Sequence, residues 1–182
     1  MCGRFHSLTQ EQLNTFFALA GTTLSQIKVG EVFPTEFALV KTKFGFAEMQ
    51  WGIPKWQGTG VIINARQETV LDKPFFREDM LHRRCVVYMP YFYEWQDHKV
   101  KNAVHRDGQP TLKVAGLYRM VDGEPRFVII TQEATPEFMV LHNRLPLMLE
   151  DDEVQDYLHG DDVARLTMSK TTVNVVWLPD ED

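Results

Sequence analysis

The chain has 182 residues, of which 44% are hydrophobic and 24% charged, and its formal net charge is −6. These values fit one soluble globular domain over residues 1–182 and exclude a disordered chain, a fibre and a coiled coil. The sequence contains no apolar run near the roughly 18 residues that a membrane span needs. The negative charge argues against a bulk electrostatic DNA binder, although residues 1–120 hold 15 basic against 11 acidic side chains and can form a local basic groove. The acidic excess of residues 121–182 is interpreted as an aid to solubility.

An amphipathic helix is predicted near the start of the chain. Thr9 can cap it, Leu13 and Phe16 belong to its apolar face, and Gly21 can end it. Shorter helices are predicted at Pro74–His82, Thr135–Leu141 and Asp151–Leu158.

Strand-like runs rich in branched and aromatic residues dominate the remaining sequence. They are Phe37–Phe44, Ala47–Gly52, Val61–Asn64, Arg84–Met89, Phe92–Trp95, Thr111–Arg119, Arg126–Thr131 and Thr172–Leu178. Asp107-Gly108 and Asp122-Gly123 are typical of hairpin turns. The pattern predicts an α+β fold, mainly an antiparallel curled sheet or open β-barrel with a few peripheral helices.

The second residue suggests a specific chemistry. If Met1 is removed, Cys2 carries a free amine, with a pKa of about 7.7–8.0, beside a thiol with a pKa of about 8.5. Such a 1,2-aminothiol can form a Schiff base with an aldehyde and then close a thiazolidine ring. The alternative is an accidental cysteine at a frayed terminus. Cys85 begins a buried-strand pattern and is interpreted as a small core residue.

Candidate acid–base groups lie further along the chain. Glu94, flanked by aromatic residues, is either a desolvated proton-transfer group or the outward polar residue of an edge strand. His142 follows a predicted helix and can be catalytic or structural. The histidines and cysteines do not have the spacing of metal ligands, so we expect no metal site. The two cysteines, Cys2 and Cys85, are too few for a disulfide framework, so we expect a reducing, cytoplasmic location.

Two further segments suggest nucleic-acid contacts. Asn64 and Arg66 end a strand-like run, where they can bind phosphate or satisfy their own loop. Trp51 and Trp56 flank a Gly-Pro loop, where together with Arg4 they can stack on bases or cover the edge of the core.

Taken together, these motifs resemble the SRAP family (SOS response-associated peptidases), whose bacterial and eukaryotic members shield abasic sites in single-stranded DNA. The resemblance covers most of the chain, and its motifs occur in the family's order. They are Met1-Cys2-Gly3-Arg4-Phe5, Trp51-Gly52-Ile53-Pro54-Lys55-Trp56, Asn64-Ala65-Arg66-Gln67-Glu68-Thr69, Arg84-Cys85 with Phe92-Tyr93-Glu94-Trp95, and Leu141-His142-Asn143-Arg144-Leu145-Pro146.

The resemblance implies a thiol-dependent protein that removes its own Met1 and crosslinks Cys2 to the sugar aldehyde of an abasic site, with lyase activity included. It implies that Asn64 orients Cys2, that Glu94 transfers protons, and that His142 opens the sugar ring and acts in reversal. Flanking DNA would be held by Arg4, Arg66, Arg144, Trp51 and Trp56. The implied partner is single-stranded DNA with abasic sites, and the protein is expected to be a monomer without cofactor, metal or membrane contact.

Three segments depart from the family's pattern. Gly30–Pro34 replaces Tyr-Asn-x-Ala-Pro and keeps only the proline, Tyr91 replaces a glycine, and Val173–Pro179 matches the C-terminal segment poorly. Two other functions stay open on the sequence: a cysteine peptidase that acts on other proteins through Cys2, His142 and Glu94, and a DNA- or partner-binding module without covalent chemistry.

Overall fold

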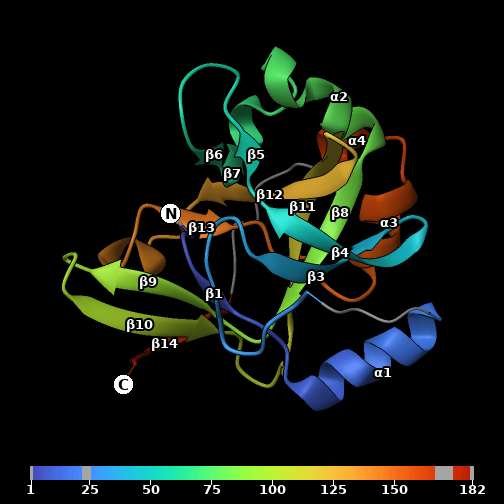
Figure 1. The fold of residues 1–182 in the computed structure, drawn as a ribbon. Coiled ribbons are helices and arrows are strands. Elements are labelled where there is room, and N and C mark those ends of the chain that lie inside the picture. Colours follow the sequence, from blue (N-terminus) through green and yellow to red (C-terminus); the bar gives the residue numbers. More distant parts are fainter. Residues whose placement is uncertain (1, 22–25, 167–173, 181–182) are drawn as a thin grey trace.

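The computed structural model describes residues 2–21, 26–166 and 174–180 and shows an α+β fold in which antiparallel strands dominate (Figure 1). The predicted fold class is confirmed. Within these residues, no helix is both long and apolar enough to cross a membrane.

The strands belong to a barrel, a second sheet and a small two-stranded ribbon. Their bounds are β1 Phe5–His6, β2 Glu31–Val32, β3 Phe37–Thr42, β4 Gly45–Trp51, β5 Ile53–Pro54, β6 Val61–Ile62, β7 Asn64–Arg66, β8 Arg84–Met89, β9 Phe92–Gln96, β10 Val100–His105, β11 Leu112–Val121, β12 Glu124–Glu133, β13 Arg144–Pro146 and β14 Val176–Pro179.

The barrel is built from β3, β4, β8, β11 and β12. Neighbouring strands follow the order β11-β8-β3-β4-β12, and the pairing of β11 with β12 closes the circle. All of these pairs are antiparallel except β4 with β12, where Phe127 lies opposite Trp51. The sequence predicted a curled or open sheet. The sheet closes because β11 and β12, ten residues each, are long enough to pair with each other and with a second neighbour.

The barrel strands separate two apolar cores. Successive side chains of a strand point to opposite faces, so Val87 packs inside with Phe127, while Val86 packs outside with Leu117. The inner core extends to the second sheet, and the outer core is covered by helices. All six residues of β8 are buried, including Cys85, as its apolar pattern predicted.

The second sheet has the strand order β14-β10-β9-β1-β2. It packs against the inner core through residues such as Phe5 and Phe92, which are fully buried. In Figure 1, β9, β10 and β14 lie beside the barrel, at the lower left. The sequence analysis missed β10, whose short run mixes apolar residues with Lys101 and Asn102; its pairing with β9 makes it a strand.

The helices are α1 Gln10–Ala20, α2 Pro74–His82, α3 Glu153–His159 and α4 Val163–Leu166, with single 3-10 turns η1 Gln67–Thr69 and η2 Phe138–Val140. The predicted caps of α1 are confirmed: the Thr9 hydroxyl accepts a hydrogen bond from the Gln12 amide, and Gly21 ends the helix with a left-handed φ of 62°. The bounds of α2 match their prediction, and α3 begins two residues later than predicted.

One helix prediction was wrong. Thr135–Leu141 was expected to be helical, but only the 3-10 turn η2 forms there. The amide of Ala134 donates to the carbonyl of Asn143 (3.1 Å), so the chain leaves and rejoins the sheet at adjacent points. That constraint leaves room for a tight turn and places His142 directly after it.

The other local predictions are largely confirmed. Asp122 and Gly123, with φ of 53° and 85°, form the two-residue turn between β11 and β12. Gly108 lies in the turn that the Arg106–Gln109 bridge closes. The predicted strand Thr172–Leu178 is described from residue 174 onward, where β14 forms; its first two residues lie outside the described residues.

Candidate active site

Strand β1 positions Cys2. It lies between β2 and β9, with Phe5 opposite Phe92, and the Tyr93 amide donates to the Arg4 carbonyl (2.9 Å). Because the strands are antiparallel, residues before Phe5 run beside residues after Phe92. Cys2 therefore lies near Glu94, and the core buries it to 1% exposure.

Asn64 contacts Cys2 from another part of the fold. It begins β7, which pairs in parallel with β12. Its side-chain amide donates to the Cys2 carbonyl (2.8 Å), which ties the N-terminal segment to the barrel. The buried Asn64 Oδ1 accepts no hydrogen bond within the described residues, so it can accept one from a bound group.

The burial of Glu94 excludes the outward position on an edge strand, which was one of the two alternatives that the sequence left open. Its strand β9 is not an edge strand, since β1 and β10 flank it. Glu94 is 4% exposed and pairs across the ladder with Asn102, which is 2% exposed. Side chains opposite each other in a ladder share one face, so both polar groups lie on the buried face of the sheet.

Electrostatics links Cys2, Glu94 and His142. Burial raises the pKa of the Cys2 thiol, and the Glu94 carboxylate raises it further. Burial lowers the pKa of His142 below its ordinary 6.5, while Glu94 acts in the opposite direction. The resting thiol is therefore protonated and the imidazole neutral at pH 7, with Glu94 close enough to influence both groups.

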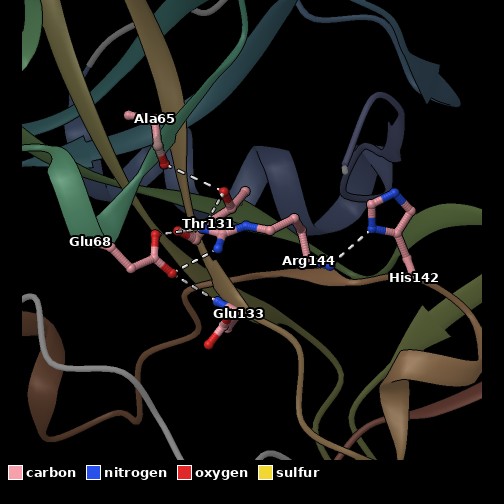
Figure 2. Close-up of polar contacts among 6 residues, drawn as sticks. All are labelled: Ala65, Glu68, Thr131, Glu133, His142 and Arg144. Atoms are coloured by element: carbon pink, nitrogen blue, oxygen red, sulfur yellow. Dashed lines mark hydrogen bonds and ion pairs between the residues drawn. The ribbon is translucent and has the colours of Figure 1, made fainter.

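A hydrogen bond fixes the tautomer of His142. Its Nδ1 accepts from the backbone amide of Arg144 (2.9 Å), as Figure 2 shows. An accepting Nδ1 carries no proton, so the neutral ring has its proton on Nε2. The ring can therefore donate a proton from Nε2 to a bound group.

The Arg144 side chain joins two segments of the site (Figure 2). Its guanidinium makes a bidentate pair with Glu68 (2.7 and 2.9 Å) and donates to the Thr131 carbonyl (2.6 Å). Partial burial opposes ionisation of Glu68, but hydrogen bonds from Arg144 and the Glu133 amide outweigh it and lower the pKa of Glu68. With 11% exposure, the Arg144 side chain is already paired, and a phosphate would have to displace Glu68.

The sequence model of the family described as SOS response associated peptidase (SRAP) matches residues 1–177. The chain belongs to this family.

Several relatives and solved structures are similar to this SRAP chain. The abasic site processing protein YoaM of Bacillus subtilis is 32% identical over 126 residues, which cover 62% of this chain and 56% of YoaM. The abasic site processing protein YedK of Escherichia coli is 28% identical over 119 residues, covering 61% of this chain and 54% of YedK. The chain thus spans about half the length of the curated relatives it matches. A crystal structure of a Bacteroides thetaiotaomicron protein shares the fold, with a TM-score of 0.81, 20% identity and coverage of 100% of this chain and 93% of that one.

The two tryptophans of the SRAP loop have different environments. Trp56 is 84% exposed and can stack on a base. Trp51 has no exposed surface, packs against Phe5 and Phe127, and donates its indole hydrogen to the Ile63 carbonyl (3.0 Å). Of the two alternatives that the sequence left open for Trp51, this burial favours a place in the core, because a base cannot reach the ring while the core is packed.

The two remaining candidate DNA contacts also differ in availability. Arg66 is exposed at the end of β7, where its guanidinium can meet a phosphate. Arg4 is stacked 4.3 Å from the centre of the Phe33 ring and paired with Glu31 (3.0 Å). A phosphate that binds Arg4 would therefore compete with the carboxylate of Glu31.

The sequence analysis did not single out Asn102, Glu68 or Glu31. Asn102 lies on strand β10, which the sequence analysis missed. The strand-like run Phe92–Trp95 needs a hairpin partner, and a search for one in the residues that follow could have found β10. Glu68 stood inside a quoted motif, but its partner Arg144 is 76 residues away. Within the described residues, no group of three or more His, Cys, Asp or Glu side chains is arranged to hold a metal ion.

Proposed function

We propose that this SRAP protein traps abasic sites in single-stranded DNA as a covalent adduct on Cys2, after removal of Met1. The observation that carries the proposal is the convergence of Cys2, Asn64, Glu94 and His142 from four separate segments. The names of the relatives, abasic site processing proteins, agree with this class of substrate.

The reaction uses both functional groups of an N-terminal cysteine. The Cys2 amine adds to the aldehyde carbon of the ring-opened sugar, and a proton moves from nitrogen to oxygen. Loss of water gives the imine. The thiol then adds across the carbon–nitrogen double bond, with sulfur bonding to carbon and its proton passing to nitrogen. The products are a thiazolidine and one water molecule, and no oxidant or cofactor enters the balance.

The arrangement suggests a role for each neighbouring side chain. We assign to Glu94, whose charge raises the pKa of the Cys2 thiol, the transfer of protons between amine, hydroxyl and thiol. His142, neutral at pH 7, donates from Nε2 during opening of the sugar ring and in reversal of the adduct. Asn64 fixes the Cys2 backbone, and its free Oδ1 can accept from the amine or the sugar.

The order of the steps follows from the state of the thiol. Because burial and the Glu94 charge both raise the pKa of Cys2, little thiolate is present before substrate binds. The amine therefore attacks first and the thiol second. A cysteine peptidase acting on other proteins attacks with a thiolate. Since the raised pKa of Cys2 disfavours the thiolate, it favours the amine-first crosslinking function over that alternative.

Intact mass measurement tests the proposal. The protein is measured before and after mixing with single-stranded DNA that carries one abasic site. We expect loss of Met1 and an adduct whose mass is the sum of protein and DNA less one water. Cys2→Ala should form no heat-stable adduct.

Cys85→Ala is the matched control, because Cys85 is equally buried but lies in the barrel wall. It should form the adduct as the wild type does. Retention of Met1 in the reacting protein, or an equal adduct yield in Cys2→Ala, would contradict the proposal. Turnover of an added peptide that is lost in Cys2→Ala would support the peptidase instead.

A further inference from the structure

The segment Gly30–Pro34 provides two partners of Arg4. They are the carboxylate of Glu31 and the ring of Phe33. Glu31 lies on β2, next to β1. One of its carboxylate oxygens pairs with Arg4 (3.0 Å), and the other pairs with Lys101.

These residues form a compact cluster of four charges, comprising Arg4, Glu31, Lys101 and Asp180. Asp180 pairs with Lys101 at 2.6 Å, so these four described residues comprise two cations and two carboxylates. The formal charge of the cluster is therefore zero. Single-stranded DNA approaching this side of the second sheet meets no net positive charge from it.

Aromatic rings hold Arg4 in this arrangement. Its guanidinium lies 4.3 Å from the centre of the Phe33 ring and 5.0 Å from that of Trp95, and its side chain is 30% exposed. A guanidinium stacked in this way keeps a fixed plane with a few free N–H edges. A phosphate bound there would share Arg4 with Glu31 or replace it.

Arg4 is also close to the reacting group. It lies two residues after Cys2, at most about 7 Å along the chain. A phosphate bound to Arg4 therefore belongs to the same short stretch of strand as the trapped sugar. Glu31, rather than Asp180, controls this contact, since Asp180 pairs only with Lys101 among the described residues.

We propose that Glu31 sets the affinity of this protein for single-stranded DNA by competing with the DNA backbone for Arg4. The inference rests on the proposed function, since it assigns Arg4 to the phosphate beside the lesion. The protein should therefore bind undamaged single strands weakly, because the Glu31 carboxylate and a DNA phosphate compete for the same guanidinium. Retention on DNA then depends on the covalent bond, which only an aldehyde can form.

Binding measurements in a Cys2→Ala background test the inference. Fluorescence anisotropy of a labelled single strand, carrying a non-reactive abasic analogue, gives Kd over a series of salt concentrations. Glu31→Gln should bind about three- to tenfold more tightly at low salt. Its slope of log affinity against log salt should steepen by about 0.7, which corresponds to one more neutralised phosphate.

Asp151→Asn is the matched control. It removes one negative charge as Glu31→Gln does, but Asp151 is 82% exposed and pairs with Lys113. Its Kd should change by less than about twofold. In an Arg4→Met background, the effect of Glu31→Gln should vanish, because the two residues act through one contact. Glu31→Asn provides the same comparison if thermal melting shows that Glu31→Gln is unfolded.

Unchanged affinity and salt slope in Glu31→Gln would overturn the inference, and so would an effect that persists in the Arg4→Met background. Adduct formation by the Cys2 protein is measured alongside. If the adduct forms while Glu31→Gln binds as the wild type does, the inference alone fails. If Glu31→Gln binds more tightly but no adduct forms, the covalent function alone fails.

Discussion

The two faces of the second sheet carry different chemistry. On the buried face, Glu94 and Asn102 lie opposite each other, close to the thiol of Cys2. On the other face, Arg4 and Lys101 meet carboxylates at partly exposed positions. Because side chains alternate along a strand, the same short strands supply both sets.

The difference shows how burial assigns roles to similar groups. Glu94 and Glu31 are both carboxylates of this sheet, but Glu94 is 4% exposed and Glu31 has a 26% exposed side chain. The buried carboxylate raises the pKa of the Cys2 thiol and opposes the lowering of the pKa of His142 by burial. The partly exposed one balances cations that could otherwise attract DNA. Substitutions on either face should therefore separate reaction rate from DNA affinity.

The largest expected effect is on stability and comes from the inner core, against which the buried face of the second sheet packs. Trp51→Ala should lower the free energy of unfolding by about 3–5 kcal/mol, since it removes a fully buried ring that packs against Phe5. Urea unfolding measures this change. Trp56→Ala, at an 84% exposed position, is the control and should stay within about 0.5 kcal/mol of the wild type. Equal losses in both variants would contradict the assignment of Trp51 to the core.

The next effect is on the reaction itself. Glu94→Gln keeps the size of the side chain but removes the proton carrier, so the rate of adduct formation should fall about 100-fold. Single-turnover gels measure the rate at saturating DNA, and the Kd should stay unchanged. Glu124→Gln, at the exposed first residue of β12, should react at the wild-type rate. A tighter Kd with a normal rate would instead place Glu94 among the charges that repel DNA.

Glu68→Gln distinguishes two functions of Arg144. If the Arg144–Glu68 pair positions His142, the rate should fall about three- to tenfold with an unchanged Kd, because the pair holds the segment whose amide binds the ring. If Arg144 instead holds a DNA phosphate, removing its ion pair with Glu68 should lower the Kd for DNA. We expect the former result. Asp156→Asn, which breaks an ion pair with Arg165 outside the site, is the control for loss of a carboxylate.

The smallest effect is a pH dependence of stability. Burial gives His142 a lower pKa in the folded protein than in the unfolded chain, so the unfolded state binds more protons below about pH 6.5. Stability from this group is therefore present above that range and is lost as the pH falls. His142→Gln should lose less stability than the wild type between about pH 7.5 and about pH 5.5. Thermal melting at several pH values measures the difference, and parallel curves would contradict it.

Local signals in the sequence determined the local structure. The capping residues of α1, the proline that begins α2 and the Asp-Gly turn between β11 and β12 act over a few residues, so their consequences could be predicted. The apolar run of β8 likewise predicted a fully buried strand. Regions governed by distant partners, such as β10 and the segment around η2, were missed or predicted as helix.

The sequence by itself also indicated the chemistry that we propose, through a cysteine at position 2 and the motifs that contain Asn64, Glu94 and His142. Only the tertiary structure decided which side chains are available. It buried Trp51, paired Arg144 with Glu68 and placed Glu31 against Arg4, although each of these partners is far away in the chain. Such pairings depend on strand order and register, because a carboxylate 27 residues from an arginine becomes its neighbour only when β1 and β2 lie side by side.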